Sequence, residues 1–438
     1  MATVVLLGTC DTKLEELLFL RSRILENKHL QVVMIDVGRQ PVSHNAITIS
    51  QPQLISPYGD ATTAGSELLD LPRADLIKFM SSCATAAIKH LCTTNTIHGI
   101  ISAGGSGGTS LAAPVMRDAV PIGFPKMLVS TVASGDVSPY VGESDIAMLY
   151  SVVDIAGLNA VLRGVLSNAG AAIAAAALSY AARQSESETQ EEGKDIRRVG
   201  ITMFGVTTPA VTTIRRHLSS GTFYHPSSPT PIAFETLVFH ATGSGGRAME
   251  RLIRAGELDA VLDLTTTEIC DFVVPGGTMS AGPDRLSAAV EKGIPCIVSL
   301  GATDMVNFGG RGTVPERYVK EGRKLYEHNS AVTLMRTDED EVRKVGEFVS
   351  GKLRGVEEEG RVEVWIPRGG VSVLSTAGGV FEDRKVDGVL FDTLKSGLCG
   401  TRVRVVEDER DVNDEGFAKD VAEALLRVMG LEKCGLHS

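Results

Sequence analysis

The sequence predicts an α/β protein with two doubly wound lobes whose sheets are mainly parallel. Short runs rich in β-branched residues alternate with amphipathic or alanine-rich helical patterns along the chain. The alternation breaks once, at the acidic, polar segment RQSESETQEEGKD (residues 183–195), and then starts again. We therefore expect a Rossmann-like N-terminal lobe at residues 1–182, a polar linker at 183–195 and a Rossmann-like C-terminal lobe at 196–438.

The elements of the N-terminal lobe follow from these patterns. Strands are expected at residues 3–7, 31–37, 97–103, 126–131 and 146–153. Helices are expected at residues 12–27, 73–92, 109–119 and 158–182. The last helix contains a long apolar stretch, 164–182, which is rich in alanine and is interrupted by polar residues. This composition indicates a buried helix packed on a sheet rather than a membrane span, which needs about 20 strongly apolar residues.

The pattern of the C-terminal lobe is similar. Strands are expected at residues 198–204, 236–239, 260–264, 296–300, 332–335 and 362–366. Each is followed by a turn and most by a helix, which predicts a second parallel sheet. Residues 219–232 are dense in proline and serine and are expected to form an exposed loop.

Bulk properties narrow the classes of function. With 438 residues, 43% of them hydrophobic and 22% charged, the chain is globular in composition and too long for one core. The net charge of −11 is spread without a basic stripe, which argues against direct binding of nucleic acid. The seven cysteines form no CxxC pair or Cys/His cluster, so reduced thiols and a cytoplasmic location are expected, without a structural metal. The N-terminus has no basic leader, and neither secretion nor membrane association is expected.

The strongest single signal is the glycine-rich segment AGGSGGTS, which directly follows the strand expected at 97–103. Consecutive glycines before a helix let backbone N–H groups surround an anion, and hydroxyl groups can add donors there. The segment is neither a Walker motif nor GxGxxG, since no lysine follows the glycines. We favour a phosphate-binding turn over a merely tight one, with these residues as candidate nucleotide contacts: Gly104, Gly105, Ser106, Gly107, Gly108, Thr109 and Ser110.

Two other strand ends of the N-terminal lobe present small or hydroxyl residues at the same expected edge. The turn after the first strand offers Gly8, Thr9, Asp11, Thr12 and Lys13 as nucleotide contacts, although an ordinary capped helix start explains it equally well. The turn after residues 126–131 offers Thr131, Ala133, Ser134 and Gly135.

Three carboxylates are further candidates. Asp36 ends the second strand, where Rossmann-type folds place an acid against a ribose hydroxyl, but a solvated loop acid is an equal alternative. Asp145 and Asp154 could bind magnesium or act as a base, or could bond local backbone.

The C-terminal lobe has its own glycine turn, HATGSGGRAME, in which Arg247 could meet an oxyanion. Two further strand ends, at 265–268 and 301–309, bring other polar residues to the expected edge. We take His240, Arg247, Glu268 and Asp304 as candidate catalytic residues, against the alternative that they are structural.

Eight motifs, in the order in which they occur, resemble the family of the tomato mosaic virus resistance protein. They are GTCDTK, AGGSGGTS, PKMLVSTVASGD, SVVDIAGLN with SNAGAA, TMFGVTTPAV, FHATGSGGRAME, DLTTTEICDFV and SLGATDMVNFG. The resemblance implies an ATP-binding unit of two α/β subdomains that forms dimers. It implies nucleotide contacts at residues 8–13, 104–110, 131–135 and 167–170. It also implies a viral helicase as the partner in the plant protein, although residues 219–232 depart from the plant pattern.

Three readings of the function follow. The first is a dimeric protein that binds ATP with Mg²⁺ in its N-terminal lobe and resembles an inhibitor of viral RNA replication. The second is an enzyme that acts on a small anionic substrate between the lobes, with or without an ATP-dependent step. The third is an interaction protein whose glycine turns are architectural. The number of small-residue turns at strand ends favours the first over the third.

Overall fold

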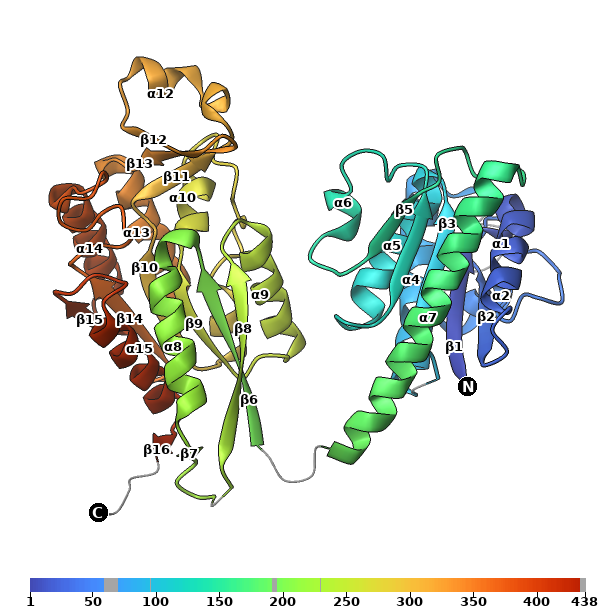
Figure 1. Cartoon of the computed structure of the whole chain (residues 1–438), viewed down its shortest axis with the longest axis horizontal. Coiled ribbons are helices and arrows are strands. Elements are labelled where there is room, and N and C mark those ends of the chain that lie inside the picture. The colour runs from blue at the N-terminus through green and yellow to red at the C-terminus, as the bar shows by residue number, and fades with distance from the viewer. Residues whose placement is uncertain (59–69, 95, 191–194, 229, 434–438) are drawn as a thin grey trace. The chain divides into compact units, whose positions relative to one another are not determined.

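The computed structural model describes residues 1–58, 70–94, 96–190, 195–228 and 230–433. The chain divides into two compact units, 1–192 and 193–438, and each has its own α/β core (Figure 1). The polar segment at 183–195 differs from the expected linker. Its first eight residues continue the preceding helix, and its last residue, Asp195, begins the first strand of the second unit.

The N-terminal unit has a five-stranded parallel sheet in the order β2-β1-β3-β4-β5. The strands are β1 (Ala2–Gly8), β2 (Leu30–Asp36), β3 (Gly99–Gly104), β4 (Lys126–Ser130) and β5 (Ala147–Tyr150). The helices are α1 (Cys10–Ile24), α2 (Gln51–Tyr58), α4 (Arg73–Thr93), α5 (Ser106–Ala119), α6 (Ser138–Val141) and α7 (Ala160–Gln190). All five strands expected from the sequence are present, and the doubly wound fold is confirmed.

Helices cover both faces of this sheet. One hydrophobic cluster joins α1 and α7 to the sheet, and the other joins α2, α4 and α5 to it. The strand order places β1 between β2 and β3, so the chain leaves β1 and β3 toward opposite faces. Such a switch point is where open α/β sheets bind their ligands, outside the carboxyl ends of the strands.

The long helix α7 packs on the sheet as the sequence predicts, but it is only half covered. Its segment Ala160–Ser185 is long and apolar enough to cross a membrane, and 39% of its most apolar window is buried. Leu162, Leu166, Ile173 and Ala177 are buried against the sheet and α1. At Gly170 the helix approaches α1 so closely that an added Cβ would lie 2.7 Å from Cβ of Arg23.

The C-terminal unit has an eight-stranded sheet in the order β15-β14-β10-β9-β6-β8-β7-β16. Its strands are β6 (Asp195–Met203), β7 (Phe223–Tyr224), β8 (Ile232–His240), β9 (Ala260–Thr265), β10 (Cys296–Gly301), β14 (Val362–Pro367), β15 (Arg404–Asp408) and β16 (Glu432–Lys433). The six strands from β15 to β8 are parallel, whereas β7 pairs antiparallel with both β8 and β16. The short strand β7 lies within the segment that was expected to be a loop.

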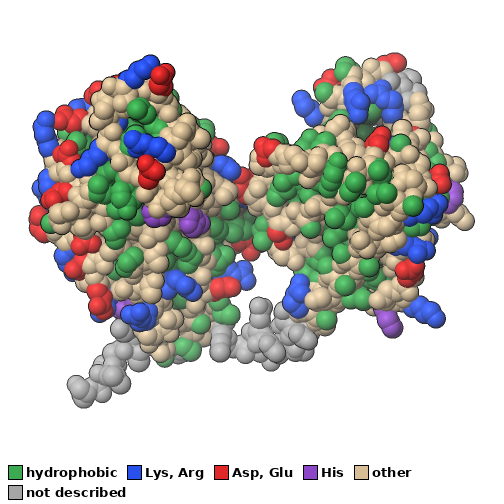
Figure 2. All heavy atoms as spheres, turned by 45° about the horizontal axis from the view of Figure 1, so that its top comes forward, with side chains coloured by type: hydrophobic (Ala, Val, Ile, Leu, Met, Phe, Trp, Pro, Cys, Tyr) green, Lys and Arg blue, Asp and Glu red, His purple; other side chains and the backbone are tan. Residues whose placement is uncertain are grey.

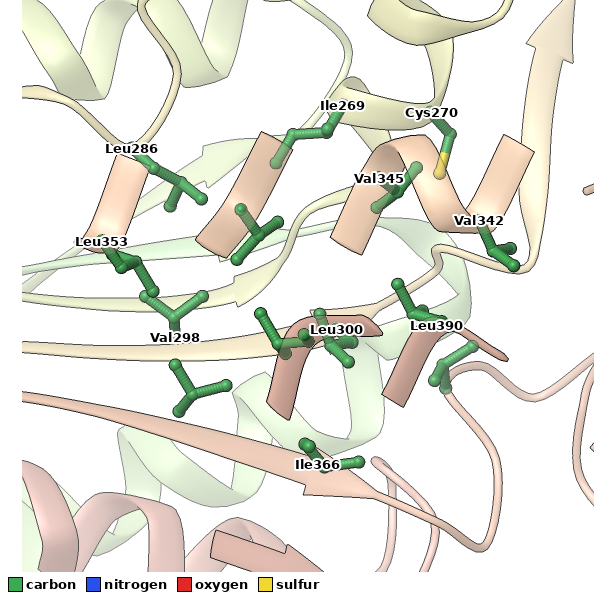
Figure 3. Close-up of a cluster of buried hydrophobic side chains, with 14 of the residues drawn as sticks. Ile269, Cys270, Leu286, Val298, Leu300, Val342, Val345, Leu353, Ile366 and Leu390 are labelled. Carbon is green, nitrogen blue, oxygen red and sulfur yellow. The ribbon is translucent and has the colours of Figure 1, made fainter. Parts of the chain in front are cut away.

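The main helices of this unit also form two layers. They are α8 (Thr208–Ser220), α9 (Ser244–Ala255), α10 (Thr267–Val273), α11 (Ala288–Lys292), α13 (Glu339–Leu353), α14 (Arg384–Leu398) and α15 (Glu415–Val428). One layer packs α8 and α15 on the sheet. The other packs α9, α10, α13 and α14 on the opposite face, where residues such as Val298, Val345 and Leu390 interdigitate (Figure 3).

One expected strand belongs to a different sheet. β13 (Val332–Arg336) does not join the parallel sheet but pairs antiparallel with β11 (Met305–Phe308) and β12 (Leu325–Asn329). The helix α12 (Glu316–Lys320) lies in the connection between β11 and β12. This small sheet was not predicted.

A buried ion cluster crosses the core of the C-terminal unit. The Arg285 guanidinium, 1% exposed, forms two hydrogen bonds to Asp263, and its Nε donates to Glu268 Oε2 at 2.8 Å. Its Nη1 also lies 3.5 Å from Glu250 Oε1, and Glu250 accepts the amides of Leu286 and Ala288. The cluster ties β9, α9 and α10 to the segment that precedes α11.

We expect Arg285→Met to destabilise the C-terminal unit by about 3–5 kcal/mol, because it leaves three buried carboxylates without their cation. The control is Arg254→Met, which removes a half-exposed ion pair with Glu291 and should cost about 1 kcal/mol or less. Denaturant unfolding can be followed by fluorescence of Trp365, the single tryptophan of the chain. Equal midpoints for the two variants would contradict a stabilising role for the cluster.

We expect Gly170→Val to destabilise the N-terminal unit by about 1–3 kcal/mol, because the new side chain would overlap α1. Gly164→Ala is the matched control in the same helix. An added Cβ there meets nothing within 4 Å, so the change should stabilise the helix by about 0.5–1 kcal/mol. Hydrogen exchange of peptides from residues 1–182 measures both effects, and equal protection in the two variants would argue against close packing at Gly170.

Candidate functional site

A cavity of about 460 Å³ opens at the carboxyl edge of the N-terminal sheet, at its switch point. Its walls come from the turns after β1, β2 and β3, from α4 and from the segment after β5. The lining residues are Thr9, Asp11, Thr12, Lys13, Val37, Arg39, Arg73, Leu76, Ile77, Gly104, Gly105, Ser106, Gly107, Gly108, Leu111 and Asp154. The structure therefore brings together two of the turns that the sequence singled out.

The start of α5 forms one wall of the cavity. The helix begins at Ser106, three residues earlier than expected, so Gly107 and Gly108 lie in its first turn. The first intrahelical bond there runs from the Thr109 amide to the Gly105 carbonyl at 2.9 Å. The amides of residues 106–108 have no acceptor within the helix, and Gly105 at the N-cap has no side chain to offer one. Partial positive charge at the helix start therefore faces the cavity.

Two glycines of this turn have close neighbours. An added Cβ on Gly104 would lie 3.2 Å from Cα of Gly108, and one on Gly107 would lie 2.6 Å from Nη2 of Arg73. The Arg73 guanidinium thus lies directly over the first turn of α5.

The turn after β1 supplies hydroxyl and charged groups. The Thr9 and Thr12 hydroxyl groups are 2.9 Å apart. Lys13 has non-helical backbone angles, and its ammonium group donates to the Ile155 carbonyl. Asp11 Oδ2 accepts the amides of Arg39 and Gln40, whereas its Oδ1 is a buried atom without a hydrogen-bond partner. An unpaired carboxylate oxygen at a cavity wall is a ready ligand for a cation.

The cavity has a charged part and an apolar part. Arg39, Arg73 and Lys13 contribute three cations against the carboxylates of Asp11 and Asp154. The apolar part consists of four side chains, those of Val37, Leu76, Ile77 and Leu111. An anionic group next to an aromatic or aliphatic group would fit this division.

Asp36 has a structural position. It is fully buried, and its Oδ1 accepts the Cys10 amide at 3.1 Å and the Gly38 amide at 2.9 Å. It therefore caps the start of α1 and fixes the turn after β2. Burial raises the pKa of Asp36, and the two amide hydrogen bonds oppose that rise.

The remaining N-terminal candidates support the α5 turn or lie beside it. The buried Thr109 hydroxyl bonds the Gly105 carbonyl at 2.9 Å and lies 2.6 Å from Ser130 Oγ, while Ser110 follows it in α5. Thr131 lies beside Gly105, 3.7 Å from an added Cβ there. Ala133 is partly buried, and Ser134 and Gly135 are exposed in the same loop. Asp145 pairs with the buried Lys126 and accepts the Gly123 amide.

The implied contact segment 167–170 lies in the middle of α7. Its Gly170 is packed against α1, as described above.

The glycine turn of the C-terminal unit already holds an anion, and that anion belongs to the protein. Glu268, fully buried, accepts the Gly243 amide at 2.6 Å and the Gly246 amide at 3.0 Å through Oε1, while Oε2 meets Arg285. An added Cβ on Gly246 would lie 2.1 Å from Glu268 Oε2. The expected acid–base role of Glu268 is therefore replaced by a structural one, because the carboxylate is held on both sides.

The other three catalytic candidates differ in their burial and in their contacts. His240 ends β8 and is exposed, with its ring against Phe204 at 5.5 Å between centroids. Arg247 is exposed and donates to the Ser280 carbonyl. Asp304 is fully buried and accepts the Ser372 hydroxyl at 2.7 Å. Burial raises the pKa of Asp304 to about 6, and nearby Arg336 opposes the rise.

Sequence reasoning missed the residues that α4 and the β2 turn bring to the cavity: Arg39, Arg73, Leu76 and Ile77. Arg73 is about 30 positions before the glycine turn, so local spacing carries no signal for it. Arg39 could have been identified from the sequence, because it follows Gly38 in the turn after the second strand.

Comparison with known proteins supports the resemblance noted above. A UPF0261 protein of Clostridium tetani is 42% identical over 97% of this chain and 98% of its own length. The ToMV resistance protein Tm-1(GCR237) of Solanum lycopersicum is 37% identical over 97% of this chain. The ToMV susceptible protein tm-1(GCR26) of the same plant is also 37% identical. This chain spans about half of each tomato protein, 55% of its length.

Solved structures are more distant. A UDP-N-acetylglucosamine 2-epimerase from Rickettsia bellii matches with a TM-score of 0.20 and 9% identity, covering 98% of this chain and 96% of its own. That similarity is too low to bear on function.

Family models give the same assignment as the relatives. The N-terminal domain of an uncharacterised protein family, UPF0261, matches residues 2–182, and the C-terminal domain of that family matches residues 197–429. The resemblance to the tomato family is confirmed, since the tomato proteins match along the same length. On this evidence the chain belongs to the uncharacterised protein family UPF0261.

Proposed function

We propose that the N-terminal unit binds ATP in the cavity at its switch point, with the phosphates at the start of α5. The observation that supports this most directly is the set of amides at residues 106–108, which lack an acceptor in the helix and face a cavity with three cations. Helix starts of this kind bind phosphate through N–H groups and the helix dipole. The cavity volume of about 460 Å³ falls in the range of small-molecule sites.

The proposed orientation follows from the two parts of the cavity. Arg73 lies over Gly107 and would contact the phosphates, together with Lys13 and the Thr9 and Thr12 hydroxyl groups. The apolar side chains of Leu76, Ile77 and Leu111 would pack against the base. In this orientation the backbone amides of α5 would bind the charged phosphates, and the apolar side chains would contact the base.

Magnesium is part of the proposal. Among the residues that the structure describes, no group of three or more His, Cys, Asp or Glu is placed to hold a metal. Mg²⁺ in nucleotide sites is commonly held by one or two carboxylates together with phosphate oxygens. Asp11, with its unpartnered Oδ1, and Asp154 fit that role at the cavity wall.

We also propose a cytoplasmic homodimer. The six cysteines in the described part of the chain form no disulfide bond, which suits a reducing compartment. Edge strand β5 exposes Tyr150 by 40%, and the following Val152 is exposed by 58%, so this edge offers apolar surface to a second copy. Inhibition of viral replication stays outside the proposal, because a resistance and a susceptible protein of tomato match this chain equally well.

The Gly107→Val change should weaken ATP binding by about a hundredfold or more, because its side chain would fill the space between α5 and Arg73. Calorimetric titration of the full chain with ATP, ADP and NAD, each with Mg²⁺, measures this and ranks the ligands. Gly164→Ala in α7 is the control and should bind as the parent does. If the Gly107→Val protein binds ATP as tightly as the parent, the proposed site is wrong.

Arg73→Gln should weaken ATP binding by about tenfold and reduce its dependence on salt, because one charge-assisted contact to phosphate is lost. The same titration at two salt concentrations measures both quantities. A change in affinity without a change in salt dependence would mean that Arg73 only shapes the cavity.

Sedimentation equilibrium of the full chain should give twice the 46.4 kDa of one copy. Tyr150→Lys should shift this value toward one copy, because it places a charge on the proposed apolar edge. A dimer that is unchanged by Tyr150→Lys would place the interface elsewhere.

A further inference from the structure

A second cavity of about 460 Å³ lies in the C-terminal unit, at the amino ends of β14 and β15. This is the edge opposite to the one where α/β sheets usually bind substrates. Three arginines line it: Arg402 from the turn before β15, Arg404 at the start of β15 and Arg427 in the last turn of α15. Figure 2 shows charged side chains of both signs on one face of each unit.

A buried carboxylate orients two of these arginines. Glu363, 3% exposed, accepts Arg427 Nη2 at 2.9 Å on both of its oxygens, and Arg404 Nη1 lies 3.4 Å from Oε1. The Trp365 indole also donates to Glu363, at 3.0 Å. A guanidinium group carries five N–H donors, so each arginine keeps donors beyond those that Glu363 uses.

The positive charge at this cavity exceeds what the protein itself needs. The Glu363 carboxylate carries one negative charge, and Arg427 alone can balance it. Arg404 adds a second cation, and Arg402 a third, which forms no ion pair or hydrogen bond within the described residues. Glu359 at the rim offsets one of these. The side chains of Arg404 and Arg427 are 61% and 50% exposed, so the donors that Glu363 does not use can reach a solute.

We infer that this cavity binds a small oxyanion, the phosphate or carboxylate group of a soluble molecule, through Arg402, Arg404 and Arg427. Arginine forks match the planar geometry of such groups and form two parallel N–H···O bonds to them. The cavity also has apolar surface, from Val403 and Val428, and its volume leaves room for a small organic group beyond the anion. The site is independent of the ATP cavity, which lies in the other unit.

The single tryptophan of the chain reports on this site directly. Trp365 donates to the carboxylate that holds Arg427 and Arg404, so an anion bound to these arginines changes the polarity around the indole. We therefore expect a saturable change in tryptophan fluorescence when the full chain is titrated with inorganic phosphate or with succinate. The two titrations distinguish a phosphate site from a carboxylate site, and chloride at equal ionic strength is the blank.

Arg402→Gln should weaken the preferred anion by about tenfold while leaving the fold intact, because Arg402 supports no internal bond. Arg343→Gln, which changes an exposed arginine on α13, is the matched control and should bind as the parent does. Gly107→Val should also retain the fluorescence response, which separates this site from the ATP cavity. The inference is overturned if neither anion gives a saturable change beyond the chloride blank. It is also overturned if Arg402→Gln and Arg343→Gln bind equally well.

Discussion

The backbone amides at the start of a helix need an acceptor, and much of this structure depends on how that need is met at the ends of parallel strands. At five helix starts the chain supplies its own carboxylate. Asp36 caps α1, and Asp338, Asp383 and Asp414 cap α13, α14 and α15. Glu268 does the same for the glycine turn that precedes α9. The start of α5 receives no such side chain, and it borders the cavity at the switch point.

The two glycine turns are similar in sequence but have different surroundings. In the C-terminal unit, Glu268 can be buried at the turn because Arg285 balances it, and Arg285 in turn is held by Asp263 and Glu250. The glycine turn and the helices α9 and α10 are therefore held together through the same buried ion cluster. In the N-terminal unit the start of α5 instead borders a cavity that Arg39 and Arg73 help to line.

The sequence predicted the two-unit α/β architecture well, because alternating strand and helix patterns are local. The sequence predicted most strands and helices, but it did not predict which strands pair or which side chains come into contact. The run at 332–336 forms a strand as expected, but nothing in five residues indicates an antiparallel sheet with β11 and β12. The strand at 404–408 was missed because charged residues at both ends obscure its apolar centre. Within the site, Gly104–Gly108 were evident, whereas Arg73 depends on how α4 packs on α5. The sequence also does not show that Glu268 is buried.

A carboxylate attached to the chain competes differently from one in solution. Because Glu268 is tethered beside the Gly243 and Gly246 amides, its effective concentration there is set by the fold and not by the composition of the solution. The C-terminal turn is therefore permanently saturated, and its conformation cannot follow the metabolic state of a cell. The start of α5 differs in this respect, because no carboxylate of the chain bonds its first amides within the described residues.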